Sequence, residues 1–122
     1  IHLMAYDHAF PQATYAKSKA DVERLIGFGC PVSKIALGLP FYGRNRERVA
    51  RTYAEIVARH RVPESDIADG YACNGPGTIK AKIAFARQRR LAGIMIWEIG
   101  QDGRGRKALL PTIVREISQP AQ

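Results

Sequence analysis

Three short apolar runs divide the chain. They span residues 1–6, 34–40 and 92–98, and almost every side chain in them is apolar. Such runs are typical of strands covered on both faces, because a strand with one face in water alternates apolar and polar residues. The first run stops abruptly at Asp7, and Pro40 closes the second. The pattern therefore predicts three buried strands.

Apolar residues at helical spacing mark the segments between and after these runs. The helical segments cover residues 19–28, 52–60, 78–90 and 107–117. Ser18 and Thr78 are residue types that cap the start of a helix, and Gly29 is the type that ends one. Pro63 stops the second segment. The predicted order is βαβαβα, an α/β fold.

Alternating strands and helices form a parallel sheet with right-handed crossovers, and the carboxyl ends of its strands lie along one edge. Ligands of α/β folds bind at that edge. The residues predicted to lie there are 6–8, 41–44 and 97–98. Because they include aromatic rings, carboxylates and an arginine, they favour a sugar as the ligand.

Length and composition are those of one globular domain. The chain has 122 residues, of which 46% are hydrophobic and 25% charged, and no apolar run approaches the roughly 20 residues that cross a bilayer. These values argue against disorder and against membrane insertion. Cys30 and Cys73 are far apart and have neither a CxxC pair nor zinc-ligand spacing, so we expect no metal site and no disulfide framework.

The first residues contain no cationic leader and no initiating Met. The chain also begins inside a predicted strand. We therefore expect it to be a piece of a longer protein.

Nineteen Lys and Arg against eleven Asp and Glu give a formal net charge of +8. Such a charge favours polyanionic partners. The cations could bind phosphates or form the solvated outer faces of helices, and we favour solvation because no usual nucleic-acid-binding signature occurs. The two groups of cations are Arg44, Arg46, Arg48, Arg51, Arg59 and Arg61, and Lys80, Lys82, Arg87, Arg89 and Arg90.

Three segments together resemble a known family. They are residues 3–7 (LMAYD), 34–44 (KIALGLPFYGR) and 93–98 (GIMIWE). In order and spacing they are similar to the last three strands of a family 18 glycoside hydrolase, the chitinase family, and the similarity extends over almost the whole chain. The resemblance implies a TIM (β/α)8 barrel of about 250 residues or more. The whole chain, residues 1–122, would then be its C-terminal part, the last three strands with their helices.

The resemblance also implies a function. Family 18 enzymes hydrolyse β-1,4-linked N-acetylglucosamine polymers with retention, and the sugar's own acetamide oxygen attacks the anomeric carbon. The proton donor is the final Glu of a DxxDxDxE motif, which this chain lacks. We therefore expect the parent protein to be a secreted chitinase that needs no cofactor or metal, and the segment alone to be inactive.

Five residues match the family's substrate-orienting positions. Tyr6 matches the tyrosine whose hydroxyl orients the acetamide, and Asp7 matches the neighbouring aspartate that contacts the adjoining sugar. Trp97 matches the tryptophan beneath the distorted sugar, whose flat face suits a pyranose ring. Met4 lies two residues before Tyr6 and so on the same side of its strand. Arg44 matches the arginine that reaches toward bound sugar.

Alternative interpretations remain for several of these residues. Without the resemblance, Tyr6 and Trp97 are more simply aromatic residues that fill the core. Asp7 and Glu98 could be a glycosidase's two carboxylates, an interpretation that we reject because neither matches the family's acid. The runner-up function is a non-catalytic carbohydrate-binding or structural fragment.

The three histidines fit structural roles. We expect His8 to lie at the edge formed by the carboxyl ends of the strands and His2 to pack within its strand. We expect His60 to lie at a helix C-terminus, where the helix dipole stabilises a positive charge. Their spacing indicates no metal site.

A three-stranded parallel sheet on its own has two unpaired edges. It would also expose an apolar face carrying Met4, Tyr6, Met95 and Trp97, and large apolar faces are rarely left open in soluble monomers. We therefore expect the isolated chain to form a homo-oligomer, most simply a two-fold dimer, or else to be prone to aggregation.

Overall fold

The computed structural model describes residues 1–59 and 66–120. Three strands, β1 (His2–Leu3), β2 (Ala36–Pro40) and β7 (Gly93–Trp97), form a parallel sheet in the order β1-β2-β7. The prediction of three parallel strands is confirmed. The first strand is shorter than the run of residues 1–6 suggested, because the chain turns after Leu3, where the Ala5 N–H donates to the Leu3 carbonyl.

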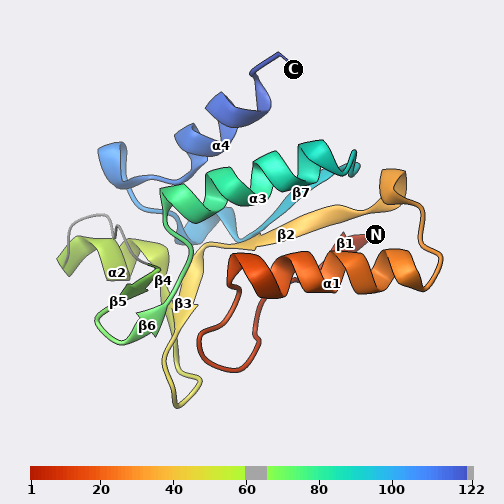
Figure 1. Cartoon of the computed structure of the whole chain (residues 1–122). Helices are drawn as coiled ribbons and strands as arrows, with labels where there is room; N and C mark the ends of the chain where they lie inside the picture. Colours follow the sequence, from red (N-terminus) through yellow and green to blue (C-terminus); the bar gives the residue numbers. More distant parts are fainter. Residues whose placement is uncertain (60–65, 121–122) are drawn as a thin grey trace.

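Three helices accompany this sheet: α1 (Tyr15–Gly27), α3 (Pro76–Gln88) and α4 (Leu110–Ile117). Figure 1 shows them on one side of the strands, with α3 lying between α1 and α4. In the sheet itself, the side chains of Leu37 and Leu39 are fully buried and pack against this helical layer.

The start of α1 differs from its prediction. Thr14 caps the helix by accepting the Lys17 N–H, so the helix begins one turn before the predicted cap, Ser18. Ser18 is instead buried and donates to the carbonyl of Ala5. The end is as expected: Gly29 has a φ of 95° just after the helix, and its N–H returns to the Ile26 carbonyl.

Helices α3 and α4 also begin at residues other than those predicted from the sequence. Pro76 is the first residue of α3, and the hydroxyl of Thr78 donates to Asp66 rather than capping the helix. A single turn of 3-10 helix occupies Gly105–Lys107, and α4 begins only at Leu110. The reason is Asp102, whose carboxylate accepts the N–H groups at the start of α4. Asp66 and Asp102, which both lie outside the helices, thus bind residues at or near the two starts.

A second, smaller sheet was not predicted from the sequence. Its strands are antiparallel and only two or three residues long, too short to carry a readable pattern. They are β4 (Ala50–Thr52), β3 (Tyr42–Arg44), β6 (Tyr71–Ala72) and β5 (Ile67–Ala68), in that order across the sheet.

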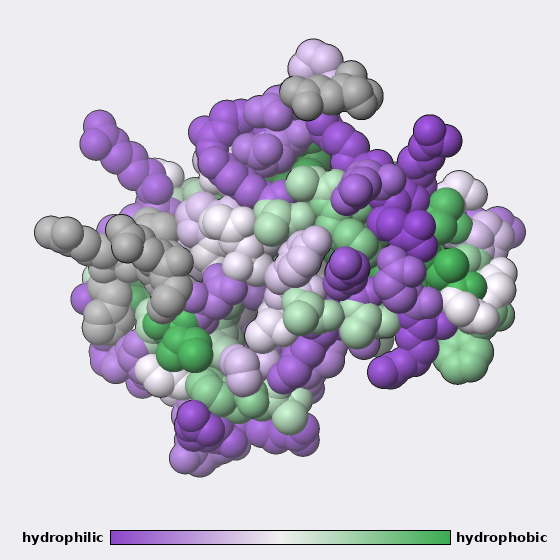
Figure 2. Space-filling view, viewed as in Figure 1, coloured by the Kyte–Doolittle hydropathy of each residue, from purple (hydrophilic) through white to green (hydrophobic). Residues whose placement is uncertain are grey.

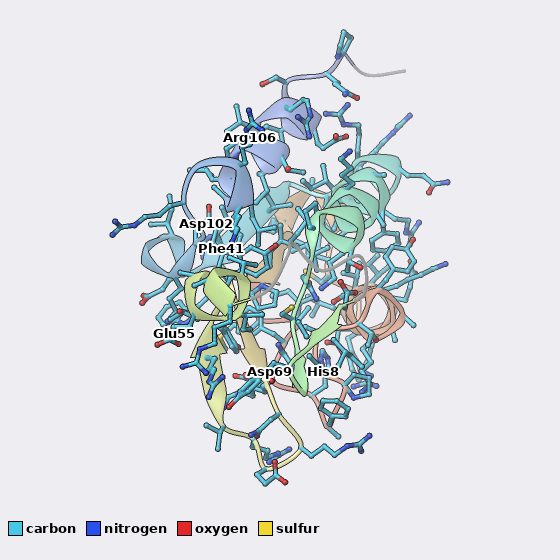
Figure 3. The ribbon with its side chains drawn as sticks, turned by 90° about the vertical axis from the view of Figure 1, so that its left-hand side faces the viewer. His8, Phe41, Glu55, Asp69, Asp102 and Arg106 are labelled. Atoms are coloured by element: carbon cyan, nitrogen blue, oxygen red, sulfur yellow. The ribbon has the colours of Figure 1, made fainter. Side chains whose placement is uncertain are left out.

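Helix α2 (Tyr53–Arg59) directly follows β4, close to the predicted 52–60. Thr52 and Glu55 form a reciprocal cap at its start: the Thr52 hydroxyl accepts the Glu55 N–H, and the Glu55 carboxylate accepts the Thr52 N–H. Phe41 connects the small sheet to the parallel one, because its N–H donates to the Trp97 carbonyl and its own carbonyl accepts the Tyr53 N–H. In Figure 3, Glu55 lies at the margin of α2, whereas Phe41 lies toward the parallel strands.

The two faces of the parallel sheet have different surroundings. Leu37, Leu39 and their neighbours in register on β7 point toward the helices. Met4 and Trp97 point to the other face, and their side chains are 69% and 53% exposed. The expectation that this sheet on its own exposes Met4 and Trp97 is therefore confirmed. Of the residues expected on the open face, only Tyr6 is buried, because it packs against Ala13 and Tyr42.

Charged residues cover much of the helical side. Figure 2 shows hydrophilic side chains spread over this face between smaller hydrophobic areas. Arg89 pairs with Glu23, and Lys80 lies 4.0 Å from Glu116, as expected for solvated helix faces. One member of the predicted solvated group is an exception, since Lys82 is fully buried. Within the described ranges, no helix is both long and apolar enough to span a bilayer.

Candidate functional site

An open cavity of about 530 Å³ lies where the carboxyl ends of the parallel strands meet the small sheet. The parallel strands contribute apolar and aromatic side chains to it, and the small sheet with α2 contributes mostly polar ones. All five predicted site residues line it. The full lining is Met4, Tyr6, Asp7, Tyr42, Arg44, Ala50, Arg51, Thr52, Glu55, Trp97 and Gln101.

Tyr6 carries the most distinctive polar atom of the cavity. Its side chain is 9% exposed, and its buried hydroxyl has no hydrogen-bond partner among the described residues. Burial, with the nearby Asp7 charge adding to it, raises the pKa of this hydroxyl above its ordinary value. Tyr6 is therefore protonated, and its hydroxyl is a donor without a partner among the described residues.

The Tyr6 ring is held by two neighbours. It meets the ring of Tyr42 edge to face, with 5.9 Å between the ring centroids. It also lies directly over Gly38 of β2, where an added Cβ would come within 2.9 Å of Tyr6 Cε1 and 3.2 Å of Met95 Cε. Gly38 thus leaves the space that the ring occupies.

Asp7 lies at the centre of a charged cluster. Its Oδ1 accepts a hydrogen bond from the Tyr42 hydroxyl at 2.7 Å and another from Arg44 Nε at 2.6 Å. Burial alone would raise the pKa of Asp7, but these two hydrogen bonds and the Arg44 charge lower it below its ordinary value. Burial and the bond to Asp7 strongly raise the pKa of Tyr42. The cluster therefore keeps Asp7 ionised and Tyr42 protonated.

Trp97 and Met4 supply exposed apolar surface beside this cluster. Both belong to the open face of the parallel sheet, on which Trp97 is paired in register with Pro40. Within these 122 residues about half of the Trp97 side chain is exposed. A flat aromatic surface next to hydrogen-bonding groups is an arrangement that suits sugars.

The sequence analysis missed the other polar residues of the cavity. Glu55 and Thr52 come from the capping pair of α2, and the Thr-x-x-Glu spacing was the signal that could have found them. Arg51 stacks 4.7 Å from the centroid of the Tyr71 ring and bonds Asp69 at 3.2 Å. Tyr42 was placed at the correct edge but not recognised as a partner of Asp7.

The remaining titratable candidates lie outside the cavity. Glu98 is exposed and does not line it, and His8 instead bonds Asp21 at 2.7 Å on α1. His2 is exposed, so its predicted packing is wrong: its strand is the edge of the sheet. His60 lies outside the described residues, as do Arg61 and Pro63.

The described residues contain no group of three His, Cys, Asp or Glu side chains that could hold a metal ion. Cys30 and Cys73 are both free thiols. Burial raises the pKa of the Cys73 thiol to about 12, and so keeps it protonated.

Comparison with known proteins gives a consistent result. The model of the family described as "Glycosyl hydrolases family 18" matches residues 1–102. Chitinase 1 of Aphanocladium album is 26% identical over an alignment that covers 92% of this chain and 38% of that protein. The chain therefore spans well under half the length of this relative.

Solved structures agree with this match. A GH18 chitinase from the chitin utilization locus of Flavobacterium johnsoniae superposes with a TM-score of 0.87 and 33% identity, covering 95% of this chain and 41% of that one. A chitinase-like agglutinin from Robinia pseudoacacia superposes with a TM-score of 0.78 and 29% identity, covering 94% and 46%.

Proposed function

The chain belongs to glycosyl hydrolase family 18, and we propose that it forms the substrate-orienting part of a chitinase-like site for β-1,4-linked N-acetylglucosamine polymers. One observation carries this proposal. Met4, Tyr6, Asp7, Arg44 and Trp97, which come from three separate segments of the sequence, line one cavity.

We propose further that residues 1–122 are the C-terminal part of a (β/α)8 barrel, with its last three strands. The parallel order β1-β2-β7 and the helices on one side support this. The open face that carries Met4 and Trp97 corresponds in this proposal to the interior of the barrel. The chitinase-named structure that it resembles is more than twice as long, which leaves room for the other strands.

In the proposed mechanism, the Tyr6 hydroxyl donates to the acetamide oxygen of the sugar as that oxygen attacks the anomeric carbon. A donor that is already in position where charge develops stabilises the transition state. Asp7, held by Tyr42 and Arg44, accepts from the adjoining sugar, and the Trp97 ring supports the distorted sugar from below. The reaction retains the anomeric configuration and needs no cofactor or metal ion.

The proton donor is the part that these 122 residues do not supply. They contain no DxxDxDxE motif, so we propose that the general acid comes from elsewhere in the parent enzyme. General acid catalysis contributes typically 10²-fold to 10⁴-fold. The 122-residue chain should therefore turn over a fluorogenic chito-oligosaccharide at the background rate, whereas the parent enzyme should hydrolyse it. Turnover by the chain that Glu98→Gln abolishes would contradict the proposal and make Glu98 the acid.

A non-catalytic sugar-binding role is the second candidate, and the likeness to a chitinase-like agglutinin favours it. The two functions predict different results for the full-length protein. A chitinase shortens chito-oligosaccharides, which product analysis by mass spectrometry detects. A binding protein gives saturable binding of the same sugar without any product.

The open face also leads to a proposal about association. β1 and β7 are the edges of the parallel sheet, and Met4 and Trp97 lie exposed beside them. We propose that the isolated chain covers this face by forming a homo-oligomer, with a two-fold dimer as the simplest form. Light scattering at micromolar concentration should give the mass of at least a dimer. A monodisperse monomer that unfolds cooperatively would contradict this proposal and the half-barrel arrangement.

A further inference from the structure

The loop of residues 7–13 connects β1 to α1 and carries Asp7 into the cavity. In Figure 1 it lies below α1, beside the small sheet. Two residues in it, Asp7 and Ala13, have φ values of 63° and 56°. Residues other than glycine seldom adopt this left-handed conformation, because their Cβ crowds the backbone. Contacts made by its own side chains and by neighbouring elements must therefore hold it.

Gln12 supplies the first set of these contacts. Its side chain is 2% exposed, and its Oε1 accepts the Asp7 N–H at 2.9 Å. Its Nε2 donates to the carbonyl of Ala72 at 3.2 Å and to the carbonyl of Tyr42 at 3.4 Å. One buried amide thus joins the backbone of Asp7 to the backbones of β3 and β6.

Lys82 and Asn74 hold the next residue of the loop. Lys82 Nζ donates to the Ala13 carbonyl at 2.7 Å and also to Asn74 Oδ1. Asn74 Nδ2 donates to the same Ala13 carbonyl at 2.9 Å. Both side chains are fully buried, and Lys82 belongs to α3. The loop is therefore fixed from the helical layer on one side and from the small sheet on the other.

Gln12 does not line the cavity, but two of its three backbone partners, Asp7 and Tyr42, do. These same two residues are joined through the hydrogen bond between the Tyr42 hydroxyl and Asp7 Oδ1. A displacement of either backbone changes this bond and the direction of the Asp7 carboxylate. Gln12 controls both backbones at once.

We propose that Gln12 is a positioning residue, which sets the placement of Asp7 and Tyr42 and thereby the affinity of the cavity for an N-acetylglucosamine oligomer. Lys82 and Asn74 support it by fixing Ala13, the residue that follows it. The inference rests on the proposed function, since it concerns the same cavity. It adds a residue that makes no contact with the sugar.

The test compares two substitutions of Gln12 in the full-length protein. Gln12→Met keeps the length of the side chain and removes all three hydrogen bonds. Gln12→Asn keeps the amide but shortens its reach by one methylene, so that it cannot bond Asp7 and both carbonyls at once. We expect chitotriose to bind Gln12→Met at least about 10-fold more weakly than the native protein, and Gln12→Asn also more weakly than the native protein. If Gln12→Met does not fold, Gln12→Asn carries the comparison.

A matched control separates positioning from lost stability. Ile113 is buried in α4, in a different part of the core. Ile113→Ala should lower the melting temperature while leaving chitotriose affinity within about twofold of the native value. If the Gln12 variants lose no more affinity than Ile113→Ala does for an equal fall in melting temperature, Gln12 is only a structural residue and the inference is wrong.

A second readout does not need the sugar. The Asp7 amide resonance should shift and its hydrogen exchange should accelerate in Gln12→Met, and both should stay unchanged in Ile113→Ala. An unchanged Asp7 amide would overturn the positioning role even if the native protein binds chitotriose. Conversely, an altered amide in a protein whose native form does not bind chitotriose would refute the proposed function and leave the placement of Asp7 by Gln12 intact.

Discussion

The two faces of the parallel sheet belong to the same apolar strands, but one face is buried and the other is exposed. On the helical face, Leu37 and Leu39 are fully buried against α1, α3 and α4. On the open face, Met4 and Trp97 lie exposed beside the polar cluster of Asp7, Tyr42 and Arg44. Burial of the first face stabilises the fold, and the proposed function assigns ligand binding to the second. Substitutions on the two faces should therefore affect different properties.

The largest effect is expected on the helical face. Leu39→Ala removes a fully buried side chain from the main core and should lower the free energy of unfolding by about 2–5 kcal/mol. Chemical denaturation measures this change. Val114→Ala, at an exposed position of α4, is the control and should change stability by less than about 1 kcal/mol. Equal losses at both positions would contradict the comparison.

The pH dependence of stability tests the helical layer in another way. Burial lowers the pKa of Lys82 to about 7, although Asp66 and Asp21 attract its charge and oppose the change. Between this value and the ordinary 10.5 the unfolded chain binds more protons than the folded one, so stability rises with pH.

Above about pH 9 the raised pKa of Cys73 lowers stability as pH rises, because the folded chain then binds more protons than the unfolded chain. The range from pH 7 to pH 9 therefore isolates the contribution of Lys82. Across it Lys82 should add up to about 3 kcal/mol to the free energy of unfolding. Lys82→Met should remove this slope, and Lys19→Met, at an exposed position of α1, should keep it. A native protein whose stability is flat over this window would refute the prediction.

Tyr6 tests the open face. Tyr6→Phe removes one unpartnered hydroxyl and almost no volume, so we expect kcat of the full-length enzyme to fall about 100-fold with the melting temperature nearly unchanged. Tyr15→Phe, at an exposed position of α1, should leave kcat unaffected. Normal activity in Tyr6→Phe would make Tyr6 a packing residue, and the two faces would then not differ in role.

Trp97→Ala is expected to give the smallest effect. The lost stacking surface should weaken chitotriose binding about 10-fold, a change that isothermal titration calorimetry measures. Because half of this side chain is exposed, its loss should cost less stability than the about 3–5 kcal/mol of a buried tryptophan. Phe28→Ala removes another exposed aromatic ring, at the end of α1, and should not change the affinity. A larger effect of Trp97→Ala on stability than on binding would contradict the assignment of Trp97 to the open face.

Much of the parallel sheet could be predicted from the sequence, because its strands are short apolar runs and the apolar residues of the helices between them recur about every 3.6 residues. The open face could also be predicted in part: Met4 and Trp97 are exposed as expected, whereas the burial of Tyr6 against Ala13 and Tyr42 depends on contacts between distant segments that no local pattern indicates. The helix starts were predicted less well, because more than one residue near a start is of a type that can cap it. In α1 the cap is Thr14, whereas the predicted cap, Ser18, donates to the Ala5 carbonyl.

The site was predicted only in part for a different reason. Tyr6, Asp7 and Trp97 follow strands, so their position at one edge could be inferred from the fold. The bond between Tyr42 and Asp7 joins residues 35 positions apart and depends on a left-handed turn at Asp7. Gln12 gave no signal at all, because a single glutamine in a loop carries no periodicity.

Gly38 sets a limit on how this sequence can diverge. A methyl group there would lie 2.9 Å from the Tyr6 ring and closer still to the carbonyl oxygen of Leu3 in β1. A change at position 6 would remove the first collision but not the second, because the backbone of β1 stays in place. We therefore expect related sequences to keep glycine at position 38 even where position 6 is no longer tyrosine, whereas positions 37 and 39 should vary only among apolar residues of similar volume.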